Sequence, residues 1–431
     1  MKPIVAFLLA LPALALAQGS LTPAAAPAPT MRTLTQIEPR TPLESGVPGV
    51  TVAANGGFVI SAPGSYFLTA NLAVSSGSGI EITASNVTLD LSGFTISSTA
   101  SPNAGFAIAV ANAQQGITIR NGHIVGSFTY DPSTGTGSGS GFARGIFSSS
   151  IIRNSLVSGL TIRGTSTDGI YLDQGSTIDH CVVEHCGGMA LRAQVVTNSS
   201  AIDCNSGIAG ETLSNCQAIA YNAAINATQT ASNCTGTSTA GTGLNAANAE
   251  NCIGTSTSGT GLNATQTATG STGTTASGKY GLYVLGSATG CSGLSGYGYA
   301  GLFARIALDC DGNCPGGTYG LLADGAATNC TGFIGSASNT VAGSAAIRGG
   351  VVTGCNAENM STTANTYGIF ALISAHNSVG GGVIGIKANT SANFCHGVST
   401  GTTSPVAISA STAIGCTGNG TIVATNKYLM P

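Results

Sequence analysis

Short runs in which apolar residues alternate with small or polar ones recur along most of the chain. Several begin with Gly-Leu or Gly-Ile, at 79–82, 116–119, 169–172, 281–284, 301–304, 320–323 and 368–371. A two-residue alternation bounded by Gly, Asn and Ser predicts short β-strands. No helical period of apolar residues is sustained after residue 17, so the sequence predicts an all-β protein.

A repeat places these runs in register with cysteines. Residues 232–246 are followed 18 positions later by the closely similar segment 250–264. Looser copies centre on Cys216, Cys291, Cys310, Cys330, Cys355, Cys395 and Cys416, and the steps between cysteines run from 18 to 25 residues apart from two wider gaps. In those gaps we expect Gly270 to take the cysteine position and His376 to lie near it.

Short strands at a coil-length repeat predict a solenoid, in which each strand pairs only with the coils above and below it. Like residues then stack at about 4.8 Å. The cysteines are expected to point inward as small hydrophobes. Asn215, Asn233, Asn251 and Asn329, each directly before a cysteine, are expected to form a ladder of turns with positive φ.

The hand of the solenoid follows from the regularity of its coils. Equal steps from Cys216 through Cys234 and Cys252 to Gly270 would suit a left-handed β-helix. Later steps are longer and unequal, and insertions are expected at 127–141 and 336–345. Unequal coils favour a single-stranded right-handed parallel β-helix, with coils of about 18–25 residues.

Composition agrees with a narrow stacked coil. The 431 residues include 63 Gly, 13 Cys and no Trp, and only 7% are charged. A net charge of −3 without a run of like charges excludes the basic footprint of a nucleic-acid-binding protein and a polybasic membrane patch. The many Ile, Val and Thr residues set the chain apart from disordered sequences.

The first residues are typical of an export signal. Lys2 precedes the apolar run 4–16, which closes on small residues and predicts a signal peptide, 1–17, cleaved after Ala17. We therefore expect a protein that is secreted, periplasmic or at the cell surface and does not span the membrane. Residues 18–48 are predicted to be a Pro/Ala/Thr-rich linker or N-terminal arm, and 49–431 a β-helix domain including its N-terminal cap.

Segments 58–72, 79–82, 86–96 and 119–124 resemble the opening coils of secreted bacterial right-handed β-helix repeat proteins. The resemblance spans about residues 55–425. The wider superfamily includes pectate lyases and polygalacturonases, so the resemblance implies a parallel β-helix and an association with polysaccharide.

Charge is concentrated in residues 161–203, which hold 7 of the 29 charged side chains and two of the five His. Glycoside hydrolysis needs two carboxyl groups about 5 to 9.5 Å apart, a separation that one or two coils supply. The candidate catalytic residues are Asp168, Asp173, Glu184 and His185. The alternative is that these charges are solvated positions on the outside of ordinary coils.

Residues 167–170 also resemble the Asn-Thr-Asp-Gly-Ile segment of polygalacturonases, with Ser166 in place of its Asn. The Gly-His-Gly and Arg-Ile-Lys segments of that family have no match, which argues against the same reaction. The resemblance to pectate lyases implies Ca²⁺ as cofactor if the chain is a lyase, and no cofactor is expected otherwise. Arg163 and Arg192 are the basic candidates for substrate binding.

Four further residues are of the types that ligate metals. His180, Cys181, His185 and Cys186 lack the paired spacing of zinc sites, so no metal site is predicted. Among thirteen cysteines, Cys310–Cys314 is the first candidate for a local disulfide and Cys181–Cys186 the second.

Aromatic residues are densest around Tyr297 and Tyr299, with Phe303 nearby and Tyr280 and Tyr283 one coil earlier. Such rings would either stack on sugar rings or fill the core.

Two functions remain open from sequence. The first is a structural or adhesive module that binds polysaccharide or a glycan surface, and the second is a hydrolase or lyase that uses residues 161–203. A self-assembling adhesive spike is a weaker third hypothesis. The oligomeric state is not predicted.

Overall fold

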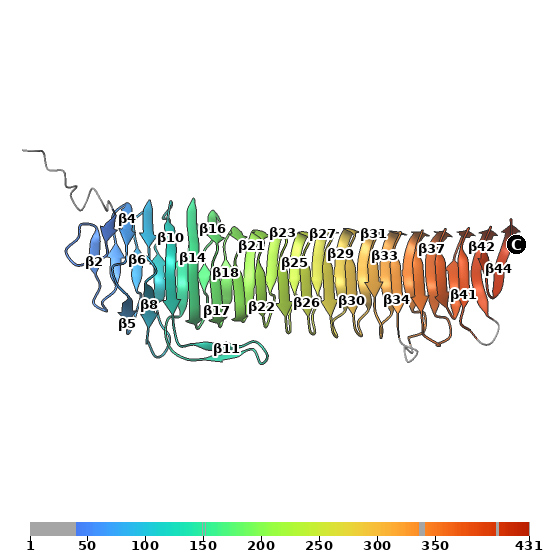
Figure 1. Cartoon of the computed structure of the whole chain (residues 1–431), viewed down its shortest axis with the longest axis horizontal. Coiled ribbons are helices and arrows are strands. Elements are labelled where there is room, and N and C mark those ends of the chain that lie inside the picture. The colour runs from blue at the N-terminus through green and yellow to red at the C-terminus, as the bar shows by residue number, and fades with distance from the viewer. Residues whose placement is uncertain (1–39, 149, 151, 336–340, 402–404, 431) are drawn as a thin grey trace, which may run out of the picture. The chain divides into compact units, whose positions relative to one another are not determined.

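The computed structural model describes residues 40–148, 150, 152–335, 341–401 and 405–430. The chain divides into the units Met1–Thr41 and Pro42–Pro431. The second unit is an all-β solenoid of about 18 turns, without a helix among its described residues (Figure 1). The predicted right-handed parallel β-helix is thereby confirmed. The predicted signal peptide and most of the predicted linker lie outside the described residues.

Each coil contributes strands to three parallel sheets, which we name A, B and C. Within each coil the chain passes through sheet A, then sheet B, then sheet C. Sheet A contains β4 (Gly64–Phe67), β7 (Val87–Asp90), β16 (Ser176–Asp179), β19 (Val195–Thr197) and β40 (Ser391–Asn393). Sheet B contains β5 (Leu72–Val74), β8 (Thr95–Ser98), β17 (Val182–Cys186), β20 (Ser200–Cys204), β22 (Gln217–Ala220), β24 (Thr235–Ser238), β26 (Ile253–Ser256), β28 (Thr272–Thr275), β30 (Ser292–Ser295), β32 (Asp311–Asn313), β34 (Thr331–Ile334), β36 (Asn356–Asn359), β38 (Val379–Gly382), β41 (His396–Ser399) and β43 (Thr417–Gly418). Sheet C contains β3 (Phe58–Ile60), β6 (Ile80–Ile82), β9 (Phe106–Val110), β13 (Arg144–Ser148), β15 (Ile170–Tyr171), β18 (Met189–Arg192) and β39 (Ile384–Ala388).

Longer strands bend from one sheet into the next. β10 (Thr118–Val125) and β14 (Ser155–Thr165) pass from sheet A into sheet B. Ten strands pass from sheet C into sheet A: β21 (Ser206–Ser214), β23 (Ile225–Ser232), β25 (Leu244–Glu250), β27 (Leu262–Thr269), β29 (Tyr280–Thr289), β31 (Ala300–Leu308), β33 (Tyr319–Thr328), β35 (Ala345–Thr353), β37 (Tyr367–His376) and β42 (Val406–Ile414), with β44 (Thr421–Tyr428) closing the series. β2 (Val50–Val52) pairs antiparallel with β3 at the N-terminal end.

The corner between sheets A and B has one residue per coil in the left-handed conformation. The φ angles lie between +45° and +65° at Ser92, Asn121, Gly159, His180, Asn198, Asn215, Asn233, Asn251, Gly270, Gly290, Asp309, Asn329, Gly354, Asn377, Phe394, Gly415 and Leu429. Gly and Asn adopt this conformation at the lowest cost, which explains why they dominate the ladder. The predicted Asn turn ladder is confirmed.

From His180 to Gly415, the residue after each corner points inward, and these residues form what we call the thiol column. Its members are Cys181, Ser199, Cys216, Cys234, Cys252, Ser271, Cys291, Cys310, Cys330, Cys355, Ser378, Cys395 and Cys416. Each side chain donates to the carbonyl two residues before it, as Cys234 Sγ does to Ser232 at 3.2 Å and Ser271 Oγ does to Thr269 at 3.0 Å. The serine hydroxyls thus replace the thiols without loss of the hydrogen bond.

The prediction that Gly270 takes the cysteine position was wrong. Ser271 occupies it, because this coil is longer than the step between Cys234 and Cys252. In the second gap Ser378 occupies the position, two residues from His376. Gly270 belongs to the left-handed ladder instead, with φ +56°.

The predicted disulfides were also wrong, because all thirteen cysteines are described, buried and free. Cys310 and Cys314 lie at opposite ends of β32, and Cys181 and Cys186 lie at opposite ends of β17. Extended chain rises about 3.3 Å per residue. The Cα atoms of either pair are therefore separated by more than the roughly 7 Å that a disulfide tolerates.

The insertion predicted at 127–141 forms an antiparallel hairpin of β11 (Thr129–Asp131) and β12 (Thr136–Ser138). It packs against β17 and β20, with Phe128 and Tyr130 buried (Figure 1). Tyr130 Oη donates to Asn205 Oδ1 at 2.9 Å.

Among the described residues, no helix has the length and apolar character needed to cross a membrane.

Candidate functional site

Asp168 holds the corner between sheets B and C. Its Oδ2 lies 2.8 Å from Arg144 Nε, and its Oδ1 accepts the Met189 N–H at 3.0 Å from the next coil. The guanidinium of Arg144 in turn lies 4.1 Å from the ring centroid of Phe147. Both carboxylate oxygens are thus engaged in joining neighbouring coils.

Glu184 and His185 lie on sheet B, near the hairpin. Glu184 is the register neighbour of Arg163 on the preceding coil. His185 has φ +52°, and its Nδ1 lies 3.4 Å from the carbonyl oxygen of Tyr130. The predicted catalytic residues are therefore distributed over a B–C corner, sheet B and, for Asp173, the C–A corner described below.

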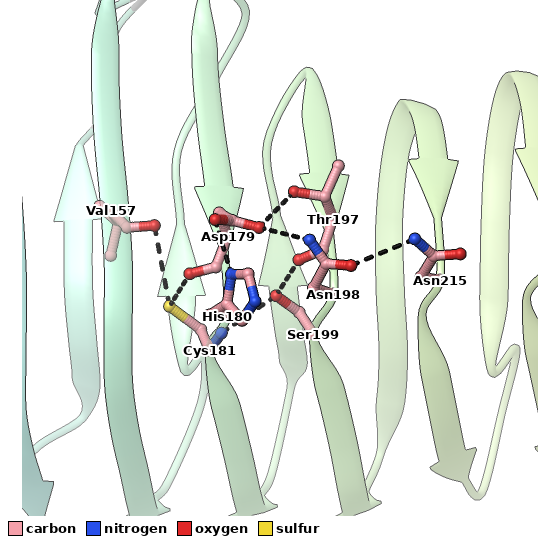
Figure 2. A network of polar contacts seen from close by, with 8 residues as sticks. All are labelled: Val157, Asp179, His180, Cys181, Thr197, Asn198, Ser199 and Asn215. Atoms are coloured by element: carbon pink, nitrogen blue, oxygen red, sulfur yellow. Dashed lines mark hydrogen bonds and ion pairs between the residues drawn. The ribbon is translucent and has the colours of Figure 1, made fainter.

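Asp179 anchors a chain of side-chain hydrogen bonds along the left-handed ladder (Figure 2). Its Oδ1 accepts from Thr197 Oγ1 at 2.6 Å and from Asn198 Nδ2 at 2.9 Å, and its Oδ2 lies 2.7 Å from His180 Nδ1. Asn215 donates to Asn198, and so continues the chain to the next coil. Burial alone would raise the pKa of Asp179, but the hydrogen bonds from Thr197, Asn198 and His180 outweigh it and lower the pKa to about 2.

We expect Asp179→Ala to destabilise the protein by about 1 to 2 kcal/mol at pH 7, because three donors lose their acceptor. A lowered folded-state pKa stabilises above the ordinary aspartate range, and this contribution is lost as the pH falls from about 4 to about 2. Urea unfolding at several pH values measures the difference between wild type and variant, which should shrink over that window. Glu81→Ala, which removes an exposed carboxylate, is the control. Equal stability of wild type and Asp179→Ala at pH 7 would contradict this role.

A groove runs along the corner between sheets C and A. One hollow in it, of about 270 Å³, is lined by residues that include Asp173, Gln174, Arg192, Gln194 and Glu211. A second hollow shares Gln174 and Gln194 and adds Arg153. A third hollow shares Arg153 and adds Gln114 and Gln115. We call the line formed by these residues the amide groove, and it crosses successive coils.

Side-chain amides are connected along this groove. Gln194 Oε1 accepts the Gly175 N–H at 2.9 Å, and Gln194 Nε2 donates to Glu211 Oε2 at 3.0 Å. Gln229, one coil further on, donates to the same Glu211 oxygen at 3.3 Å. The groove thus holds donors and acceptors whose positions repeat at the coil spacing of about 4.8 Å.

Two of the residues predicted from sequence meet in this groove. Arg192 is the register neighbour of Tyr171, and its guanidinium lies 4.9 Å from the ring centroid of Tyr171. Asp173 lines the same hollow, and its Oδ1 accepts the Gln174 N–H at 3.0 Å. The groove therefore combines a cation, carboxylates, amides and one aromatic ring at its edge.

Sequence reasoning missed Arg153, Gln174, Gln194 and Glu211. A signal was present: Gln or Glu follows the outward residue of the sheet C strand by two or three positions in four successive coils, at 174, 194, 211 and 229. Neutral amides do not register in a search for concentrated charge, and Glu211 lies just beyond the stretch 161–203.

Tyr297 and Tyr299 lie in the C-terminal half of the solenoid, away from the amide groove. Tyr297 is 81% exposed. The ring of Tyr299 lies edge-on to Tyr280 and Tyr319, at centroid distances of 6.0 and 5.2 Å. Tyr283 and Phe303 stack at 4.8 Å on the outer face of sheet C, so the core-filling alternative is wrong for this pair.

Within the described ranges, no three His, Cys, Asp or Glu side chains are grouped so that they could hold a metal ion. His180 is exposed in the left-handed ladder, whereas Cys181 beside it is buried.

The comparisons with known proteins give weak structural likenesses. No family model and no curated protein matches the chain. The A-module of the Azotobacter vinelandii mannuronan C-5 epimerase AlgE6 aligns with a TM-score of 0.24 and 10% identity, over 85% of this chain and 90% of that one. The A-module of AlgE4 from the same organism gives 0.25 and 11%, over 85% and 88%. The catalytic domain of a GH87 α-1,3-glucanase gives 0.15 and 11%, over 85% and 62%.

Proposed function

We propose that this protein binds an extended polysaccharide along the amide groove. The observation that carries the proposal is the line of amide and charged side chains across successive coils, from Gln115 to Gln229. Amides both donate and accept, as sugar hydroxyls do. Groups repeated at a regular spacing along one axis match a linear polymer better than a compact ligand, because each further coil offers the same contacts again.

The geometry at the centre of the groove supports the same proposal. Arg192 is held against Tyr171, which fixes a cation and a ring at the groove edge. Gln194 is held between Gly175 and Glu211, so its amide is oriented before a ligand arrives. Groups that are already ordered lose less entropy on binding.

We expect Gln194→Ala to weaken polysaccharide binding about threefold to tenfold, because one or two hydrogen bonds to the glycan are lost. Affinity electrophoresis against a panel of polysaccharides measures the effect, and thermal unfolding checks that the variant is folded. Gln217→Ala removes the same side chain from an exposed position on sheet B and should bind like wild type. Binding of no polysaccharide by wild type, or equal binding by both variants, would contradict the proposal.

A catalytic function is the second candidate, because two carboxylates line the same groove. Tyr171, Arg192 and Ala209 are register neighbours, so Asp173 and Glu211 follow strands two coils apart. Two coils correspond to about 10 Å, close to the separation of about 6.5 to 9.5 Å in inverting glycosidases.

Incubation with pectin, polygalacturonate and alginate separates this second candidate from binding alone. The catalytic proposal expects new reducing ends or unsaturated products from wild type, and at least about a hundredfold less from Asp173→Asn or Glu211→Gln. Asp168→Ala and Glu184→Ala test the pair proposed from sequence in the same assay. Product release unaffected by Asp173→Asn and Glu211→Gln would exclude the groove as the catalytic site.

A further inference from the structure

The cation–π contacts found among the described residues lie along the outer side of sheet C. In the N-terminal half, Arg144 lies over Phe147 and Arg192 over Tyr171. In the C-terminal half, three cations each lie within 5.0 to 5.5 Å of one or two ring centroids: Lys279 with Tyr280 and Tyr299, Arg348 with Tyr319, and Lys387 with Tyr367 and Phe370. We call this second group the basic aromatic band.

The band follows one row of register positions along the helix axis, in which Leu322 is buried. Its outward register positions, from strand to strand, are Tyr283, Phe303, Leu322, Arg348, Phe370 and Lys387. Arg348 and Lys387 are thus two coils apart, or about 10 Å. Lys279 directly precedes Tyr280, and Ala345 lies in the same strand as Arg348. Tyr280 is three coils before Ala345, so Lys279 and Arg348 are separated by about 14 Å along the helix axis.

Carboxylates are few near this face, and the exposed Asp324 lies at its edge. Residues 264–430 contain four carboxylates, Asp309, Asp311, Asp324 and Glu358. Asp309 lies in the A–B corner, Asp311 and Glu358 lie on sheet B, and Asp324 follows the sheet C part of β33. Within the described ranges, none of the three band cations is paired with a carboxylate. The charges of the three band cations are therefore not neutralised by an ion pair and are open to an anionic ligand.

We propose that the basic aromatic band is a second binding site, separate from the amide groove, for a glycan that carries anionic groups such as carboxylate or sulfate. Cations at intervals of about 10 to 14 Å match a polymer whose charges recur along its length. The tyrosine hydroxyls add donors and acceptors for sugar hydroxyls. Tyr283 and Phe303 stack on each other with their ring centroids 4.8 Å apart, so no nucleobase can insert between these two rings.

The outward side chains between the two sites have a different character. Asn226, which also lines the hollow of the amide groove, is followed by Asn245 and Asn263 in the outward positions before Tyr283. Asn245 donates to Asn226 at 2.9 Å, and Asn263 donates to Asn245 at 2.7 Å. These amides are hydrogen-bonded to one another along the axis and carry no charge. The amide groove and the band are thus distinct sites, and each has its own test.

The test uses a pair of doubly substituted proteins that match in the residue types removed. Arg348→Gln with Lys387→Gln removes two band cations, and Arg305→Gln with Lys427→Gln removes two exposed cations that have no ring contact among the described residues. Affinity electrophoresis at low salt is run with dextran sulfate, polygalacturonate, uncharged dextran and a single-stranded oligodeoxythymidylate, because salt screens exposed charges.

We expect the band variant to bind dextran sulfate or polygalacturonate about fivefold to tenfold more weakly than its control. Gln194→Ala should leave this difference unchanged, so failure of the band and failure of the amide groove are distinguishable. The proposal is overturned if both double variants bind the anionic glycans equally, if wild type binds neither of them, or if the oligodeoxythymidylate binds as tightly and shows the same loss.

Discussion

Replacement of Gly301 by alanine is expected to destabilise the β-helix by about 3 kcal/mol or more. A Cβ at this position would overlap the backbone of Asn313, where sheets B and C meet inside the coil. Gly281 and Gly320 face the backbone of Leu294 and Phe333 in the same way on the neighbouring coils. Because the nearest atoms are backbone atoms, no flexible side chain can move aside, and the strand itself must shift.

Urea unfolding followed by far-UV circular dichroism measures this loss, and Gly290→Ala is the matched control. Gly290 lies in the left-handed ladder with φ +59° and has open space where its Cβ would be. That variant should lose only about 1 kcal/mol, since the cost is backbone strain without a clash. A Gly301→Ala protein as stable as Gly290→Ala would show that the interior is wider than described.

Alkylation without reductant is expected to give no adduct on the native protein and thirteen on the unfolded one, because every cysteine is buried and free. Burial raises the pKa of the Cys181 thiol to about 11, which suppresses its reactive thiolate. Intact mass after N-ethylmaleimide treatment, with and without denaturant, counts the adducts. Fewer than thirteen adducts in denaturant would reveal disulfides and contradict the thiol column.

Substitution within that column is the control for its packing. Cys234→Ser should cost little, because Ser199, Ser271 and Ser378 already occupy the same position with the same hydrogen bond to the carbonyl two residues before. A large loss of stability in this variant would show that the column needs the size of sulfur rather than a donor at that site.

The fold could be predicted from the sequence because stacking imposes the same requirement on every coil. A left-handed corner selects Asn or Gly, and the narrow interior behind it selects Cys or Ser, so both requirements appear as a repeat. The prediction failed at Gly270, because this coil is one residue longer than the preceding step and its inward position is Ser271. A prediction that counts a fixed number of residues from one cysteine to the next cannot detect a coil that is longer by one residue.

The candidate site was harder to predict than the fold, because the charged residues within 161–203 have different roles in the structure. Asp168 joins two coils through Arg144, and Asp179 ends a chain of amides, so both are engaged within the fold. Asp173 and Arg192 do share a groove, but the groove is completed by Gln174 and Gln194. These side chains line up where the chain bends from sheet C into sheet A. The number of residues between the sheet C strand and each Gln or Glu varies, so the sequence does not show this alignment directly.

The central claim is that a polysaccharide lies along the amide groove. The most direct measurement is a crystal structure with an oligosaccharide of the glycan that binds most tightly in affinity electrophoresis. We expect sugar density running across the coils, with hydroxyls on Gln174 and Gln194 and a ring beside Arg192 and Tyr171. Sugar bound elsewhere on the coil, with these four side chains untouched, would contradict it.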